Sequence, residues 1–229
     1  MKKKYLKFLP LLLILFQQNG FSQEHYKYFE GEVTFTSEFE SLDPQIPDDY
    51  WHYVFGNSLV GVVKEYKYKT ITISESEGTT ITYYDLREKK VYIESSMSDT
   101  VKWYPLDEEP GELISIQRNK AEKKYLFDEL RESVTLEYIP DDPYVERIVS
   151  THYFMPEHKL NKKVYAEHKL NFWHLFINES GSISIRNEAF VYPFLKRVDQ
   201  VTNIDERVVD DSELEFDKSK VLVKGETGY

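Results

Sequence analysis

The chain of 229 residues contains no cysteine, so disulfide bonds and thiolate ligands for a metal are excluded. The same absence leaves no residue for lipoprotein-type acylation, and we expect a protein that is not a lipoprotein. Basic residues are also in the minority, because 29 Lys and Arg face 40 Asp and Glu and give a formal net charge of −11. An acidic chain repels phosphates and anionic membrane surfaces, so we expect no binding to nucleic acid.

Long apolar runs are missing too. The run from Phe8 to Phe16 is well short of the ~20 residues that a membrane-spanning helix needs. It follows a lysine-rich start and precedes the small residues Gly20 and Ser22, an order typical of a cleaved export signal. We therefore expect residues 1–22 to be a signal peptide and residues 23–229 to form a single β-rich domain. That domain would be soluble in the periplasm of a Gram-negative cell or outside it, with no transmembrane span left after cleavage.

The sequence also lacks the usual catalytic motifs: a Gly-x-Ser-x-Gly elbow, a phosphate-binding glycine loop and a His-Glu-x-x-His helix. We expect no catalytic residues and no cofactor, and hence a protein that is not an enzyme. The six histidines are scattered, and His168 and His174 do not share a helix face. A metal site would need them to converge in the fold with His152 and His158, and we expect no such site.

Adjacent carboxylates recur along the chain, at Asp48-Asp49, Glu108-Glu109, Asp141-Asp142 and Asp210-Asp211. A glycosidase needs two carboxylates that are matched in space rather than along the chain, so the sequence leaves a hydrolase open. We favour this function less than the two non-enzymatic ones given below. Solvated turns are the interpretation that we prefer.

What the sequence does contain is a period of two. Val33, Phe35 and Phe39 fall on one face of an extended segment whose other face is polar. Short runs rich in Tyr, Thr, Val and Ile follow, separated by turn residues, and predict antiparallel neighbouring strands. The predicted strands are 32–40, 67–74, 79–85, 90–94, 101–105, 123–127, 133–139, 147–154, 182–186, 189–194 and 197–205.

Only two segments favour helix. Pro47 and the acidic residues after it predict a helix start, and Gly56 predicts its end, with Trp51 and Phe55 on one face. The second candidate runs from about Ala166 to Ile177, where apolar residues lie near helical spacing, although a strand also fits.

Aromatic residues make up 15% of the chain and form its most informative excess. They indicate either an apolar ligand groove or an ordinary core, and the core is favoured for any single residue. The candidates for such a groove are Phe35, Trp51, Phe55, Trp103, Trp173, Phe176 and Phe190.

Four segments spread over the chain resemble a family of secreted envelope proteins related in architecture to the periplasmic lipoprotein carriers LolA and LolB. They are Gly31–Phe35, Tyr83–Leu86 with Lys90–Tyr92, Tyr153–Pro156 leading to Asn161 and Asn171–Trp173, and Val209–Phe216. Asp217 stands where similar proteins have proline, and Tyr125-Leu126-Phe127 stands where many have a cysteine-containing segment.

The resemblance implies a mainly β fold: a single curved antiparallel sheet forming an unclosed barrel, with one or two short helices, such as Asp48 to Phe55, covering its concave face. In carriers of this architecture the groove under such a cover holds acyl chains. The leading hypothesis is therefore an envelope binding protein for a lipid, an acyl chain or another apolar ligand. The alternative is an envelope protein-interaction or scaffolding module, which would offer an open sheet edge to a protein partner.

Overall fold

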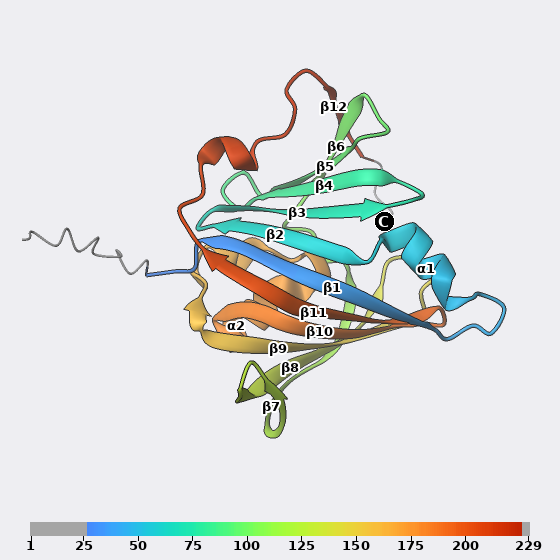
Figure 1. The fold of residues 1–229 in the computed structure, drawn as a ribbon, viewed down its shortest axis with the longest axis vertical. Helices are drawn as coiled ribbons and strands as arrows, with labels where there is room; N and C mark the ends of the chain where they lie inside the picture. Colours follow the sequence, from blue (N-terminus) through green and yellow to red (C-terminus); the bar gives the residue numbers. More distant parts are fainter. Residues whose placement is uncertain (1–26, 226–229) are drawn as a thin grey trace, which may run out of the picture.

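The computed structural model describes residues 27–225, and the predicted signal peptide lies outside them. Twelve strands form one sheet (Figure 1). The strands are β1 (Gly31–Ser41), β2 (Ser58–Lys64), β3 (Lys67–Ser74), β4 (Gly78–Asp85), β5 (Lys90–Ser95), β6 (Thr100–Pro105), β7 (Gly111–Leu126), β8 (Glu129–Pro140), β9 (Arg147–Lys159), β10 (Ser182–Tyr192), β11 (Leu195–Glu206) and β12 (Val221–Lys224).

The sheet curls without closing. Its order is β12-β6-β5-β4-β3-β2-β1-β11-β10-β9-β8-β7, so β12 and β7 are its two edges. Every neighbouring pair is antiparallel except β12 on β6. Hairpin connections of this kind need few residues, which explains the frequent short turns of the sequence. The predicted fold class, a mainly β and unclosed antiparallel sheet, is confirmed.

The period of two sets which side chains face inward. In β1, Val33 and Phe39 are buried, whereas Glu38 and Glu40 between and beyond them are exposed. The inner face of the sheet carries the main core, which includes Leu136, Phe154 and Ile185 from the neighbouring strands. Removing these side chains from water stabilises the curved sheet more than any other kind of interaction does.

Helix α1 (Asp48–Phe55) lies where the sequence predicted it, between β1 and β2. It ends at Gly56, whose φ of 75° is a conformation that side-chain-bearing residues rarely adopt. Trp51 is buried against Phe39 and Leu195 in a small cluster of its own. The helix therefore packs at one end of the inner face.

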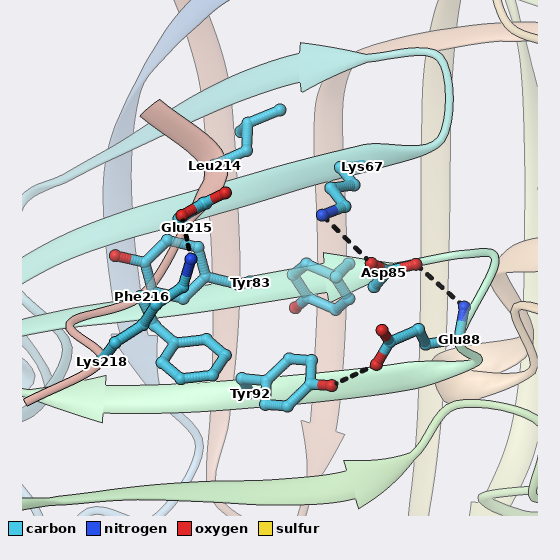
Figure 2. A pocket seen from close by; sticks show the side chains of 10 residues that line it. Lys67, Tyr83, Asp85, Glu88, Tyr92, Leu214, Glu215, Phe216 and Lys218 are labelled. Atoms are coloured by element: carbon cyan, nitrogen blue, oxygen red, sulfur yellow. Dashed lines mark hydrogen bonds and ion pairs between the residues drawn. The ribbon is translucent and has the colours of Figure 1, made fainter. Parts of the chain in front are cut away.

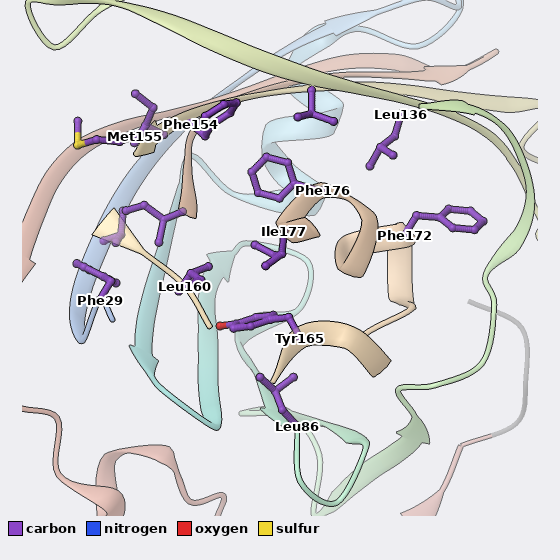
Figure 3. Close-up of a cluster of buried hydrophobic side chains, with 14 of the residues drawn as sticks. Phe29, Leu86, Leu136, Phe154, Met155, Leu160, Tyr165, Phe172, Phe176 and Ile177 are labelled. Atoms are coloured by element: carbon purple, nitrogen blue, oxygen red, sulfur yellow. The ribbon is translucent and has the colours of Figure 1, made fainter. Parts of the chain in front are cut away.

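The second helical segment starts later than the sequence predicted. Two 3-10 turns, η1 (Tyr165–Glu167) and η2 (Leu170–Phe172), precede helix α2 (Trp173–Ser180). Asn171 and Phe172 both have positive φ, near 51° and 55°, which an α-helix cannot contain, so the prediction of one helix from Ala166 was wrong in its first half. The segment lies inside the curve of the sheet (Figure 3). None of the helices in residues 27–225 has the length and apolar character that a bilayer span requires.

The C-terminal segment crosses the outer face of the sheet. A short turn, η3 (Asp211–Leu214), places Leu214 against Val62 and Val209. Phe216 then packs on Tyr83 and Tyr92 before β12 joins the edge of β6. This segment gives the outer face of β2 to β6 its own apolar contacts.

Candidate functional site: a cavity at the seam of the sheet

The space beneath α2 is filled by the protein itself. Phe172, Phe176 and Ile177 from this segment are at most 1% exposed and pack into the main core (Figure 3). Dense packing of this kind leaves little room for a ligand at that position. Space for a ligand therefore has to lie beside this core rather than under α2.

A cavity of about 590 Å³ lies where the sheet fails to close. Strand β12 pairs with Thr100–Trp103 of β6, and Gly225 after it lies against the ring of Tyr104. The loop after β6 then leads to β7. We call this space the seam cavity; its lining is Tyr104, Pro105, Glu108, Glu109, Pro110, Tyr138, Pro140, Asp141, Asp142, Val145, Ile148, Leu170 and Asn171.

The floor of the seam cavity is apolar and uncharged. Ile148 and Leu170 belong to the partly buried shell of the main core, and Tyr138 is 3% exposed. The Tyr138 hydroxyl donates a hydrogen bond to Asn171 Oδ1 at 3.3 Å. Burial raises the pKa of Tyr138 to about 12, so this phenol remains neutral at physiological pH.

The rim of the cavity is acidic. Glu108, Glu109 and Asp141 are exposed, and Asp142 is half-buried. A backbone hydrogen bond from Asp141 N to Pro110 O, at 3.0 Å, holds the two rim loops together. One cation lies among these carboxylates, since Lys169 Nζ is 3.2 Å from Glu109 Oε1. The mouth of the cavity therefore carries negative charge, whereas its floor is apolar.

The rim unites two of the four carboxylate pairs that the sequence offered as hydrolase candidates. Their positions on loops match the solvated turns that we preferred, rather than a polar cleft. The other two pairs lie elsewhere, Asp48-Asp49 in the first turn of α1 and Asp210-Asp211 at the start of η3.

A second cavity, of about 310 Å³, lies on the outer face between β4, β5 and the C-terminal segment (Figure 2). Four of its five charged side chains form ion pairs with one another, with Lys67 Nζ 3.3 Å from Asp85 and Lys218 Nζ 2.5 Å from Glu215. The ring of Phe216 lies 4.9 Å from that of Tyr92, whose hydroxyl donates to Glu88 at 2.7 Å. This mixed, ion-paired lining is less suited to an apolar ligand than the seam cavity.

The seven aromatic groove candidates separate into distinct places. Phe35 and Trp173 lie against the main core and Phe176 lies within it. Trp51 and Phe55 stack on each other at 6.0 Å in α1, and Phe55 is 39% exposed.

The remaining two candidates lie on the outer face. Trp103 packs beside Tyr83 and Tyr92, and Phe190 stacks on Tyr192 under the ammonium of Lys196. None of the seven belongs to the lining of the seam cavity. Proline adjoins paired acids at Glu108–Pro110 and Pro140–Asp142, but also at Pro47–Asp49 in α1, so this pattern alone does not identify the site.

Two of the described histidines, His152 and His168, are buried. His152 contacts the rings of Trp173 and Phe176, and burial lowers its pKa to about 4. His168 bonds the Tyr68 hydroxyl through Nε2, and burial lowers its pKa to about 3. Among residues 27–225, no group of three or more His, Asp or Glu side chains is arranged to hold a metal ion.

Comparisons with known proteins give a likeness to solved structures only. No family profile and no curated protein matches the sequence. A LolA superfamily protein from Nitrosomonas europaea is similar with a TM-score of 0.40 and 8% identity, over 83% of this chain and 92% of that one. A putative outer membrane lipoprotein-sorting protein domain from Vibrio parahaemolyticus gives 0.34 and 10%, over 80% and 89%. These likenesses concern the fold alone.

Proposed function

We propose that the chain is a non-enzymatic binding protein of the cell envelope that holds a lipid, an acyl chain or another apolar ligand in the seam cavity. The observation that carries this proposal is a space of about 590 Å³ with an apolar floor next to the main core. Binding sites for small molecules typically occupy ~300–1,000 Å³ and combine apolar walls with a few polar groups.

The chemistry of the site favours some ligands over others. Each CH₂ group removed from water on this floor contributes about 0.8 kcal/mol, so a chain of several methylenes binds without polar contacts. The carboxylates of the rim repel an anionic headgroup and accept a neutral or cationic one. We therefore expect an alcohol or amine headgroup to bind more tightly than a carboxylate on the same chain.

The alternative, a scaffolding module that pairs through an open sheet edge, is favoured by β7, which is exposed along much of its length. However, the ladder between β7 and β8 is interrupted at Leu113–Ser115 and again at Asn119–Lys124. Bulges and lysines on an edge strand discourage pairing with another strand. A stoichiometric partner recovered from envelope extract without lipid would support this alternative instead.

The test of ligand binding uses adjacent residues of β9 that point to opposite faces. Ile148 lines the seam cavity, whereas Val149 pairs with Phe190 and Glu137 on the other face. The apolar dye 1-N-phenylnaphthylamine should bind the wild type, and I148W should weaken its binding at least tenfold because the indole fills the cavity. V149W, the matched control, should bind as the wild type does, and equal binding by all three proteins would refute the site.

The charge of the rim has a separate test. Hexadecanol should displace the dye at lower concentration than palmitate, because the rim repels the carboxylate. Replacing Glu108, Glu109, Asp141 and Asp142 by their amides should narrow this difference. Native mass spectrometry of the protein before and after organic extraction would show whether it carries such a ligand from the cell.

A further inference from the structure

The hairpin between β7 and β8 extends beyond the rest of the sheet. Strand β8 pairs with β9 only over Ser133–Tyr138, whereas its ladder with β7 continues to Leu126 and Glu129. We call residues 120–131 the hairpin tip; in Figure 1 the hairpin lies at the bottom of the molecule. The tip is held to the rest of the molecule by the ion pair of Arg131 with Glu157 and by Leu126, which packs against the main core.

The hairpin tip exposes three large apolar side chains. Tyr125 is 65% exposed, Phe127 41% and Leu130 62%, and Tyr125 lies directly opposite Leu130 across the ladder. A single exposed apolar residue needs no explanation, but three large ones within six residues at the end of one hairpin do.

Phe127 is not explained by the turn that it occupies. Phe127 and Asp128 have φ of 50° and 60°, the left-handed conformation of both central residues in a type I′ turn. Asn and Gly suit this conformation, whereas a bulky side chain at positive φ is strained. An aromatic residue is therefore present here in spite of the backbone. Phe172 has a similar φ and is buried in the core, whereas Phe127 is 41% exposed, so core packing does not account for it.

The charge of the tip differs from that of the whole molecule. Its basic side chains outnumber its acidic ones, in a chain with a net charge of −11; they are Lys120, Lys123, Lys124 and Arg131 against Glu122, Asp128 and Glu129. Lys120 and Lys123 are exposed, and Lys123 Nζ lies 3.7 Å from Glu132 Oε1 at the base of the tip, whereas Lys124 is half-buried and pairs with Glu188. The negative charge of Glu129 is balanced by an ion pair with Arg131 at 3.1 Å. The tip thus presents apolar side chains beside exposed ammonium groups.

We propose that the hairpin tip inserts into the interface of a lipid bilayer. Tyr125, Phe127 and Leu130 would enter the boundary between headgroups and acyl chains, while Lys120 and Lys123 would lie at the level of the lipid phosphates. Aromatic rings, aliphatic groups and lysine stems are the combination that favours this interface, and anionic lipids complement the lysines. The site is independent of the seam cavity, which lies at the opposite end of β7, beside Pro110.

The test exploits the strained position. Asn accepts positive φ, so F127N should leave the melting temperature unchanged or raise it while removing the apolar group. Sedimentation with vesicles of three parts phosphatidylcholine and one part phosphatidylglycerol should show binding of the wild type and about tenfold weaker binding of F127N and of L130S. A matched control is I73T, because Ile73 is 64% exposed on β3, far along the sheet from the tip.

A positive readout comes from F127W, whose fluorescence should shift to shorter wavelength when vesicles are added. Wild-type binding equal to that of F127N, or an equal loss in I73T, would overturn the proposal. So would a wild type that does not sediment with vesicles, as expected of a tip that docks on another protein. I148W should bind vesicles normally, which separates this proposal from that of the seam cavity.

Discussion

At the scale of single residues, the two buried histidines show how the fold changes side-chain chemistry. His152 is 7% exposed and His168 is 2% exposed, and in each the Nδ1 atom has no hydrogen-bond partner. Burial disfavours the charged imidazolium, and this lowers both pKa values from the usual 6.5 to about 4 and about 3. Both residues were among the histidines weighed as metal ligands, and the structure makes them neutral packing residues.

These pKa values predict a loss of stability on acidification. The unfolded chain binds protons at the two histidines below about pH 6.5 while the folded chain does not, so the free energy of unfolding falls as pH drops from 6.5 toward 4. Between pH 6.5 and 5, each histidine accounts for about 2 kcal/mol at most. Urea unfolding at these pH values should show the fall, and H152L should show about half of it. A wild type equally stable at both pH values would contradict the burial of these groups as neutral imidazoles.

At the scale of elements, α2 is the part that fills the concave face. Phe176 is 0% exposed and contacts both Trp173 and His152. Its position was accessible from the sequence, because Trp173, Phe176 and Ile177 share a helix face. The start of α2 was not accessible, because the left-handed conformations of Asn171 and Phe172 serve tertiary packing and have no glycine to signal them.

This role predicts that two phenylalanines, both groove candidates in the sequence, contribute differently to the free energy of unfolding. F176A should lower the free energy of unfolding by ~3–5 kcal/mol, since it leaves a cavity in a packed core. F55A removes a side chain that is 39% exposed at the end of α1, and we expect a cost below ~1.5 kcal/mol. Denaturant unfolding of the two variants measures both values, and similar costs would mean that α2 does not anchor the core.

The sequence predicted strands where apolar and polar residues alternate clearly. It missed β2 and the first part of β7, which lack this alternation. β2 reads Ser-Leu-Val-Gly-Val-Val-Lys, and its apolar residues serve both faces, because Val62 packs on the C-terminal segment and Val63 on the main core. The first part of β7 was missed because this edge strand buries few side chains and so has no clear apolar face in its sequence. The predicted strands 182–186 and 189–194 are one strand, β10, which continues through the polar Asn187 and Glu188.

At the scale of the whole molecule, stability is unevenly distributed around the sheet. β1 and β11 pair along most of their length at the middle of the order, whereas β12 has four residues that pair only with β6. Local unfolding requires the least free energy where few apolar contacts must be broken. The open seam between the two edges is thus also the part of the sheet with the fewest neighbours.

Amide hydrogen exchange should report this gradient. We expect the slowest exchange in β1, β10 and β11 and fast exchange in β12 and the hairpin tip, because Val221 and Leu222 are 62% and 47% exposed. Addition of an apolar ligand should slow exchange in the loops around the seam cavity. Protection of β12 equal to that of β1 would show that the edge is covered by something else.

The order of residues alone predicts antiparallel strands, since alternating apolar residues on short segments bury one face of a sheet. The single curved and unclosed sheet was implied by the resemblance to the LolA and LolB carriers. The order of residues also predicts the first helix, because its start and stop depend on Pro47 and Gly56. Folding in three dimensions was needed to select which aromatic residues became core and which lie outside, and to bring Glu108–Pro110 and Pro140–Asp142 together around the seam cavity. The physical reason is range: backbone preference and periodicity act between neighbours in the chain, whereas a cavity is made by residues that only the curling of the sheet places side by side.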